Sequence, residues 1–291
     1  MKTQGLLLVQ YLRNRGVDAY LMADHELTLP TVNDTVVWLY DYPIGDNLTR
    51  IEQANTQLRF STYTDERIVK DSRLTECVST SKCPASQALD FLTVNHVVTL
   101  SDKPTRGDID TYLLNVFKTL NQYQAYETNS ANFTYAIGMY YTLKNLSDTV
   151  LERLLESDIS ILETMVLDTT KRVVHAVKSL YKGARLILVD TIGVAVTLQS
   201  EYDNEVAELV RAECARSNLS AISLHVYPVQ AMTNIHVKVR VSKDLDATLI
   251  ASKLASRKSS VQGTTYASSF YFNGTIDAFI SYLTENSELL K

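Results

Sequence analysis

The sequence has few cysteines, no long apolar run and no excess of positive charge, and each absence excludes a class of protein. Its three cysteines, Cys77, Cys83 and Cys214, are odd in number and form no Cys-x-x-Cys pair. We therefore expect reduced thiols in a cytoplasmic protein. No apolar segment approaches the roughly 18 residues that span a membrane. The N-terminus has no signal-peptide layout, so we expect neither secretion nor membrane insertion.

The charge balance excludes broad nucleic-acid binding. The net charge is −5 over 291 residues, whereas sequence-independent binding to nucleic acid needs a basic field. A local basic pocket stays possible. The seventeen tyrosines are scattered along the chain and form no stacking motif, and no internal repeat occurs. The length is sufficient for one large or two ordinary globular domains.

Common catalytic motifs are also missing. No His-x-x-x-His or His-Glu-x-x-His spacing occurs, so the sequence predicts no zinc site. No Gly-x-Ser-x-Gly element marks a nucleophilic serine. The run Asp24-His25-Glu26 lies in a polar loop, and we interpret it as a solvated surface segment.

Strands and helices alternate in the first half of the chain, which predicts an α/β fold with a doubly wound, mainly parallel sheet. The first helix ends at Gly16, a residue typical of helix C-termini. Strands are expected at 17–22, 34–41, 58–62 and 97–100, and helices at 5–15, 47–55, 85–92, 108–123 and over much of 133–155.

The second half predicts a smaller mixed α/β domain. A long helical periodicity from 154 to 181 indicates a linker helix, which divides the chain into 1–155, a linker at 156–182, and 183–291. Beyond it, strands are expected at 184–190, 194–198, 221–229 and 235–241, with helices at 204–217 and 244–256.

The run from Asn234 to Phe270, NIHVKVRVSKDLDATLIASKLASRKSSVQGTTYASSF, resembles the substrate-binding domain at the C-terminus of DHH-family phosphoesterases. In that family a strand and a helix lead to a Gly-Gly-Gly-His loop and then to Ala-Ala-Gly-Phe. Here the loop reads Val-Gln-Gly-Thr, ending in Gly263 and Thr264, and the later element reads Ala-Ser-Ser-Phe. The order of strand, helix and loop is kept, but the His and most of the glycines of the family's motifs are replaced.

The resemblance implies four Asp and His clusters that hold two divalent metals, usually Mn²⁺, to activate water against a phosphate ester. Asp41 in VVWLYDYP and Asp102 in VVTLSDKPTRGD match two of the clusters as metal-ligand candidates. Only Gln4-Gly5 stands at the first cluster, without its preceding strand, and residues 61–63 offer no ligand at the third. Alternatively, Asp41 and Asp102 cap the turns that follow their strands.

The resemblance also implies a phosphate-binding loop. Arg257, Lys258, Gly263 and Thr264 are the candidate substrate-binding residues, although the same segment is equally typical of a solvated polar loop. Our first hypothesis is a catalytically degenerate DHH-like protein that acts as a binding or assembly subunit without a cofactor. The alternative is a Mn²⁺- or Mg²⁺-dependent phosphoesterase on short oligonucleotides, cyclic dinucleotides or polyphosphate.

We also expect a protein partner. The vacancy beside 17–22, where the family has its first strand, leaves strand groups unpaired, and unpaired buried amides are costly. The sequence therefore predicts a homo-oligomer or a subunit of a larger complex, with a phosphate-containing small molecule as a possible ligand.

Overall fold

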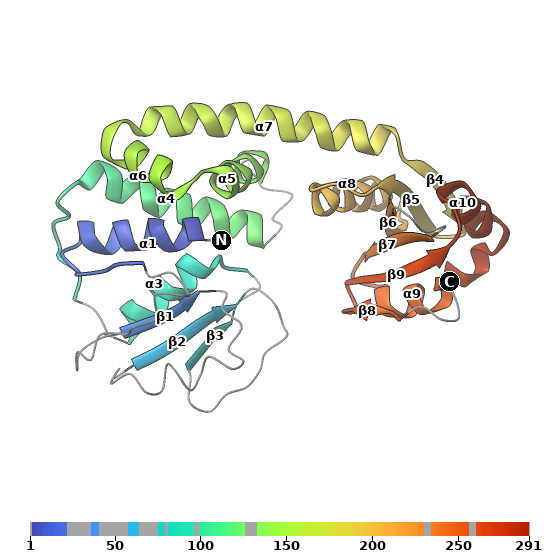
Figure 1. The fold of residues 1–291 in the computed structure, drawn as a ribbon, viewed down its shortest axis with the longest axis horizontal. Helices are drawn as coiled ribbons and strands as arrows, with labels where there is room; N and C mark the ends of the chain where they lie inside the picture. Colours follow the sequence, from blue (N-terminus) through green and yellow to red (C-terminus); the bar gives the residue numbers. More distant parts are fainter. Residues whose placement is uncertain are drawn as a thin grey trace. The chain divides into compact units, whose positions relative to one another are not determined.

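The computed structural model describes residues 2–21, 36–40, 58–63, 75–78, 81–95, 99–125, 133–229, 234–255 and 260–290. The chain divides into two compact units, Met1–Lys171 and Arg172–Lys291 (Figure 1). Helix α7, Ile159–Lys182, contains the boundary between them. Among the described residues, no helix is both long enough and apolar enough to cross a membrane. The predicted α/β fold is confirmed.

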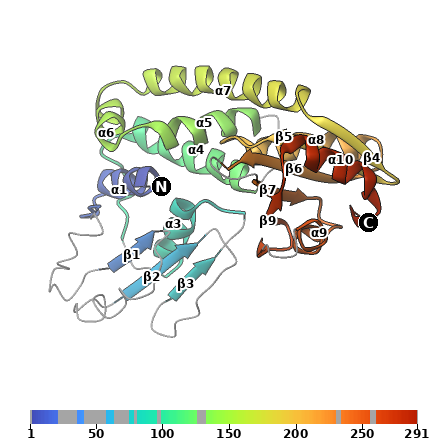
Figure 2. The ribbon, with the colours of Figure 1, turned by 45° about the vertical axis from the view of Figure 1, so that its right-hand side comes forward.

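The first unit contains a three-stranded parallel sheet in the order β1-β2-β3 (Figure 2). Trp38 lies opposite Phe60, and Phe60 lies opposite Thr75. The apolar strand predicted at 34–41 and the strand at 58–62 are confirmed, whereas the third strand was not predicted. The strands are β1 (Val36–Tyr40), β2 (Leu58–Tyr63) and β3 (Thr75–Val78).

Helices form one apolar core beside this sheet. Helix α3 packs against β2 and β3 and also against α1, which in turn contacts α4, α5 and α6. Leucines of α1, α4 and α6 meet the first half of α7 in this core. Gly138 of α5 lies so close to α7 that an added Cβ would stand 2.8 Å from the carbonyl oxygen of Val166. The helices are α1 (Lys2–Asn14), α3 (Pro84–Val94), α4 (Gly107–Gln124), α5 (Phe133–Asn145) and α6 (Asp148–Ser157).

The first helix ends as the sequence predicts. Gly16 adopts a φ of 80°, and its N–H donates to the carbonyl of Arg13 while the N–H of Val17 donates to that of Leu12. These two bonds form a Schellman motif, which requires the left-handed conformation that glycine adopts without strain.

The prediction of a strand at 17–22 is wrong for its described residues. Residues 17–21 form no ladder, because Arg13 donates to the carbonyl of Ala19 and the segment follows the end of α1. The predicted strand at 97–100 is likewise wrong at residues 99 and 100. The next residue, Ser101, donates its N–H to Arg15 at the end of α1 rather than to a strand.

The second unit contains a six-stranded mixed sheet in the order β4-β5-β6-β7-β9-β8. The four strands predicted here are confirmed to within two residues at either end, and β8 and β9 were not predicted. The strands are β4 (Arg185–Val189), β5 (Ile192–Leu198), β6 (Ser220–Pro228), β7 (Asn234–Val241), β8 (Gln262–Gly263) and β9 (Ala267–Asn273).

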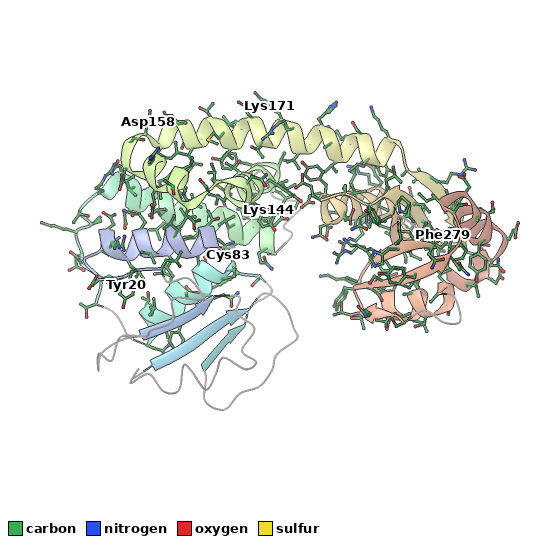
Figure 3. All side chains as sticks on the ribbon, in the orientation of Figure 1. Tyr20, Cys83, Lys144, Asp158, Lys171 and Phe279 are labelled. Atoms are coloured by element: carbon green, nitrogen blue, oxygen red, sulfur yellow. The ribbon has the colours of Figure 1, made fainter. Side chains whose placement is uncertain are left out.

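Helices cover this sheet on its two faces. Alternate residues of β5, β6 and β7 join α9 (Ala247–Leu254), α10 (Ile276–Glu285) and the 3₁₀ helix η3 (Ser287–Leu290) in an apolar core, in which Phe279 is fully buried (Figure 3). Helix α8 (Asp203–Arg216) packs mainly on β6, on the opposite face. Its approach is close, since a Cβ on Gly193 of β5 would stand 2.5 Å from the Cys214 sulfur.

Candidate functional site

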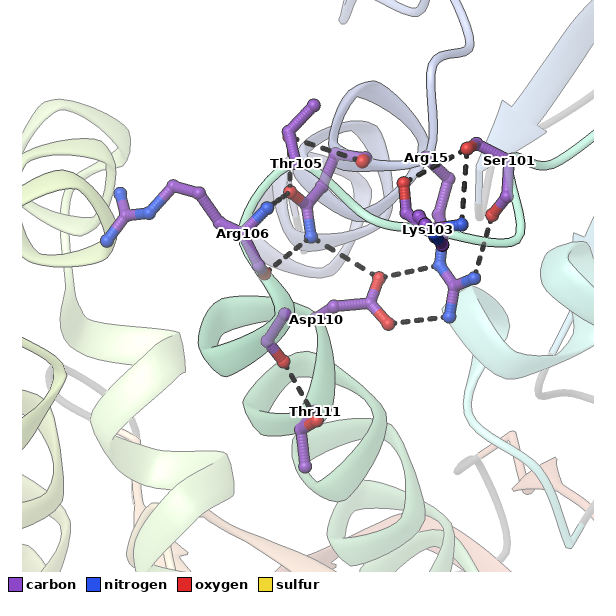
Figure 4. A network of polar contacts seen from close by, with 9 residues as sticks. Arg15, Ser101, Lys103, Thr105, Arg106, Asp110 and Thr111 are labelled. Atoms are coloured by element: carbon purple, nitrogen blue, oxygen red, sulfur yellow. Dashed lines mark hydrogen bonds and ion pairs between the residues drawn. The ribbon is translucent and has the colours of Figure 1, made fainter.

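Asp102 lies in a loop that is fastened to the end of α1. Arg15 makes two parallel bonds to the Asp110 carboxylate, Nε to Oδ1 at 3.0 Å and Nη2 to Oδ2 at 2.7 Å (Figure 4). A third nitrogen of Arg15 donates to the carbonyl of Ser101 at 2.9 Å. Since the Asp110 side chain is buried, this forked ion pair fixes the loop against α1 and α4.

Asn14 completes the attachment of this loop. Its amide donates to the carbonyl of Arg106, and its side-chain oxygen accepts from the Arg106 N–H and the Thr105 hydroxyl. The loop therefore has a rigid backbone that presents Asp102 to solvent, because the Asp102 side chain is exposed. An exposed carboxylate in a fixed loop can bind a cation or cap the turn.

Gln4, where the resemblance implies the first metal-ligand cluster, lies inside the protein core. Gln4 is buried, and its Oε1 accepts a hydrogen bond from the backbone N–H of Ala85, with 3.5 Å between the nitrogen and the oxygen. The Thr3 hydroxyl is buried as well and donates to the carbonyl of Leu143 at 3.1 Å. Both side chains are engaged within the protein. Within the described ranges, no three His, Cys, Asp or Glu side chains gather as metal ligands would.

The metal-ligand candidate Asp41 lies outside the described residues, so its role stays a prediction. The run Asp24-His25-Glu26, which we interpret as a solvated surface segment, also lies outside them.

Gly263 ends β8, and Thr264 begins the turn of the tight hairpin between β8 and β9. Thr264 donates its N–H to the carbonyl of Ala267 at 2.7 Å and accepts from the Ala267 N–H at 3.3 Å. Gly263 has a φ of 143°, and a Cβ there would stand 2.2 Å from the Ala267 carbonyl oxygen. The hairpin itself therefore requires glycine at this position, whether or not a phosphate approaches it.

Two of the four predicted phosphate-loop residues cannot be compared with the structure. Arg257 and Lys258 lie outside the described residues. The nearby N-terminus of α9 is capped, because Asp246 accepts from the N–H groups of Thr248 at 2.8 Å and Leu249 at 3.1 Å. The carboxylate already satisfies the helix donors that an anion would need.

A buried polar network lies beneath α8 and has no signature in the sequence. The ring of His225 is fully buried, with Nδ1 2.9 Å from the Thr197 hydroxyl and 3.4 Å from the Asp203 carboxylate, and Nε2 3.1 Å from the Ser223 hydroxyl. Lys238 donates to the other Asp203 oxygen at 3.3 Å. These residues come from four different elements, so no spacing in the sequence reveals them.

The order Ser223, His225, Asp203 has the connectivity of a catalytic triad, but its burial excludes that chemistry. A nucleophilic serine must reach a substrate carbonyl beside an oxyanion site. Ser223 is 2% exposed and His225 is 0% exposed, so no substrate atom can approach the hydroxyl. The network satisfies buried polar groups between α8 and the sheet, which is a structural role.

Burial also sets the protonation of the titratable groups. Desolvation lowers the pKa of His225 to about 4, with Asp203 opposing the shift and Arg240 and Lys238 adding to it. The ring is therefore neutral at physiological pH. Desolvation raises the pKa of the thiols of Cys83 and Cys214, which disfavours their nucleophilic thiolates.

Comparisons with known proteins agree with the fold. No family model matches the chain, and no curated protein matches it. The structure of a pGpG-specific phosphodiesterase, PggH from Vibrio cholerae, matches over 99% of this chain and 96% of its own, with a TM-score of 0.53 and 12% identity. The chain shares the fold of this phosphodiesterase. At this identity the likeness concerns the fold alone.

Two other solved structures match more loosely. RecJ from Thermus thermophilus in complex with Mn²⁺ matches 97% of this chain and 49% of its own at 12% identity and a TM-score of 0.44. A putative family II inorganic pyrophosphatase from Methanococcus jannaschii matches 92% of this chain and 82% of its own at 10% identity and a TM-score of 0.26. At these TM-scores neither likeness says anything further about this chain.

Proposed function

We propose that this protein uses a phosphodiesterase fold to bind a phosphate-containing ligand without hydrolysing it, as a binding or assembly subunit. The proposal joins two supports: the match to a phosphodiesterase along 99% of the chain, and the residues at the position of the first metal-ligand cluster. The match in fold suggests a phosphate-containing ligand, and the residues at the first metal-ligand cluster argue against metal-dependent hydrolysis.

The buried Gln4 carries this proposal. Two-metal hydrolysis needs several carboxylate and imidazole ligands around two ions about 3.5–4 Å apart. At the position where the resemblance implies the last Asp of His-x-Asp-x-Asp-Gly, the Gln4 side chain is neutral, buried and hydrogen-bonded within the protein. Asp41 and Asp102, without imidazole partners, would hold a metal pair weakly.

The alternative is a Mn²⁺- or Mg²⁺-dependent phosphoesterase with rearranged ligands. It is favoured by the same match to a phosphodiesterase and by the exposed position of Asp102 in a loop fixed by Arg15 and Asp110. In that case Asp102 and Asp41 would each contribute a carboxylate, and the metal ions would activate the attacking water.

Metal titration separates the two functions. We expect calorimetry with Mn²⁺ to show no stoichiometric tight binding, and we expect a 5′-phosphorylated dinucleotide to stay intact with Mn²⁺ present. The variants are Asp41→Ala and Asp102→Ala, and the control is Asp168→Ala, an exposed aspartate on α7. Tight binding of two ions per chain that is lost in either test variant and kept in the control would establish the enzyme alternative.

Assembly into a homo-oligomer, or with a protein partner, is the second part of the proposal. Strand β4 lies at the edge of the sheet order, and its side chains Leu186 and Leu188 are 59% and 68% exposed. Exposed apolar side chains on an edge strand favour association with another chain.

A further inference from the structure

The sheet of the second unit has two edges, and one of them is an apolar strand without the usual protection against pairing. In the strand order, β4 and β8 are the edge strands. Strand β8 has only two residues, Gln262 and Gly263, and both are exposed. Strand β4 has the sequence RLILV, carries one charged residue, Arg185, at its start, and pairs with β5 without a bulge. Edge strands that stay unpaired are usually short or carry lysine, proline or a bulge, so β4 is the edge suited to pairing with another strand.

Helix α8 covers one face of the sheet only as far as β5. Leu188 of β4 lies opposite Gly193 of β5, and Leu186 shares its face two residues away. On β5 this face lies beneath α8, since a Cβ on Gly193 would stand 2.5 Å from the Cys214 sulfur. On β4 the two leucines are 59% and 68% exposed, whereas Val189 on the opposite face is buried. The edge therefore exposes two leucines on the face that α8 covers one strand further in.

The backbone of β4 is also available on its outer side. Within the part of the chain that the structure describes, residues 185–189 make backbone hydrogen bonds to β5 alone. In an antiparallel ladder, every second residue directs its N–H and C=O away from the partner strand. An added strand would bond to these outward groups.

The sequence of β4 is complementary to itself. When two copies pair antiparallel about Ile187, Leu186 of each copy lies opposite Leu188 of the other. A pairing shifted by two residues would leave one leucine of each copy opposite Ala184 or Asp190. A shift of one residue would put the leucines opposite residues of the other face. The register about Ile187 is thus the one that pairs all four leucines.

The charges at the two ends of β4 select the antiparallel direction. Lys182 and Arg185 are exposed at the start of the strand, and Asp190 is exposed directly after its end. In an antiparallel pair the start of each copy lies beside the end of the other, so the cations meet the carboxylate on both sides of the two-fold axis. A parallel pair would place cations beside cations.

We propose that two copies of this chain join through their β4 strands, antiparallel about Ile187, so that their two six-stranded sheets become one continuous sheet. The four leucines then lie along the seam, on the face that carries α8 in each copy. This inference rests on the proposed assembly and names a second copy of the chain as the partner.

The first test is oxidative cross-linking of two differently tagged forms of the full chain, one with Leu186→Cys and the other with Leu188→Cys. Directly opposite residues have Cα atoms about 4.5–5.5 Å apart, which a disulfide spans. The mixture should therefore give a mixed cross-linked dimer. Either form alone should give no more than the unaltered chain, because identical residues of the two copies lie diagonally, beyond the reach of a disulfide. In the control mixture, Leu249→Cys replaces Leu186→Cys, because Leu249 is 55% exposed on α9, which packs on β9.

The second test reverses a charge. Arg185→Glu should weaken self-association by about threefold or more in sedimentation, because it places a carboxylate beside Asp190 of the second copy. Adding Asp190→Asn should restore the affinity, since it removes the repulsion and asparagine tolerates the φ of 49° at this position. Lys253→Glu, at an exposed position on α9, is the control and should leave self-association unchanged.

Hydrogen exchange tests the pairing without any substitution. Amides of 185–189 should exchange more slowly as the protein concentration rises through the range in which sedimentation detects the dimer, while those of β8 keep their rate. A dimer that gives no mixed cross-link and no such slowing in β4 would overturn this pairing and leave assembly through another surface. Cross-linking of the single forms as strong as that of the mixture would overturn the antiparallel register. A chain that sediments as a monomer at micromolar concentration would overturn both the pairing and the proposed assembly.

Discussion

Protonation of His225 should destabilise the second unit at mildly acidic pH. The ring is fully buried, and its pKa is lowered to about 4 from an ordinary value of 6.5, chiefly by desolvation. Between these two values the unfolded chain binds a proton that the folded chain excludes. The free energy of unfolding therefore falls as the pH falls from about 6.5 to about 4, and this group contributes no further loss below that range.

The magnitude follows from the size of the shift. One pKa unit corresponds to about 1.4 kcal/mol, so a shift from 6.5 to about 4 gives a loss of about 3 kcal/mol at full protonation. By pH 4.5 the expected loss is about 2–3 kcal/mol. This is a large part of the roughly 5–15 kcal/mol that stabilises a typical domain.

The assay is urea unfolding of the full chain at pH 7.5, 6.0 and 4.5. Hydrogen exchange of peptides from β6 reports the second unit, whereas fluorescence of Trp38, which lies in β1 and is the one tryptophan in the sequence, reports the first. His225→Gln keeps a neutral hydrogen-bonding side chain and should lose most of the pH dependence of the second unit. His175→Gln is the control, because that side chain is exposed on the part of α7 that belongs to the second unit.

Two results would refute this reasoning. The first is a pH dependence of second-unit stability that is the same in His225→Gln and the unaltered chain. The second is an NMR titration in which the His225 ring protonates between pH 6 and 7 in the folded protein, since that would mean that burial does not exclude the proton.

Two further predictions concern stability and assembly. Arg15→Ala should lower the free energy of unfolding of the first unit by about 3 kcal/mol, because it leaves the buried Asp110 carboxylate without its cation. Lys82→Ala removes an exposed ion pair and should cost at most about 1 kcal/mol, so equal losses in the two variants by urea unfolding would contradict the structural role of the Arg15 pair. Leu188→Glu should shift the chain toward a monomer in sedimentation velocity at micromolar concentration, while the control Leu249→Glu, at a 55% exposed position on α9, should not. If the unaltered chain sediments as a monomer at the same concentration, the prediction of self-association is wrong.

The sequence predicts those elements whose pattern depends on local contacts. The helix that ends at Gly16 follows from the left-handed conformation of a single glycine, and the strand at Val36–Tyr40 follows from an uninterrupted apolar run. The alternation of β7 also predicts a strand with one buried face. In each case, the signal lies within about ten consecutive residues.

The errors concern features that depend on distant partners. The segment 17–21 has a strand-like composition, but it follows the end of α1 because Arg13 bonds to Ala19. Strand β9, with the sequence ASSFYFN, has a partly polar pattern that becomes a strand by pairing between β7 and β8. Pairing over long distances overrides local preference in such strands.

The candidate site shows the same limit. Among the predicted binding residues, Gly263 and Thr264 are explained by the geometry of the hairpin. In the sequence, a glycine that a hairpin requires looks the same as a glycine that binds phosphate. The tyrosines show no stacking motif in the sequence, because Tyr227 and Tyr271 are 44 residues apart in number and come onto one sheet face only through the strand order β6-β7-β9. A site assembled across strands needs the register before it can be recognised.

The alternation of strand β7 fixes the register of its pairing. Its sequence NIHVKVRV alternates completely, with Ile235, Val237, Val239 and Val241 buried and the polar residues between them on the other face. A shift of one residue in the pairing would turn Lys238 and Arg240 into the apolar core, where each unpaired charge would cost several kcal/mol. The apolar face therefore fixes the register that aligns His236 with Tyr227 and Tyr271.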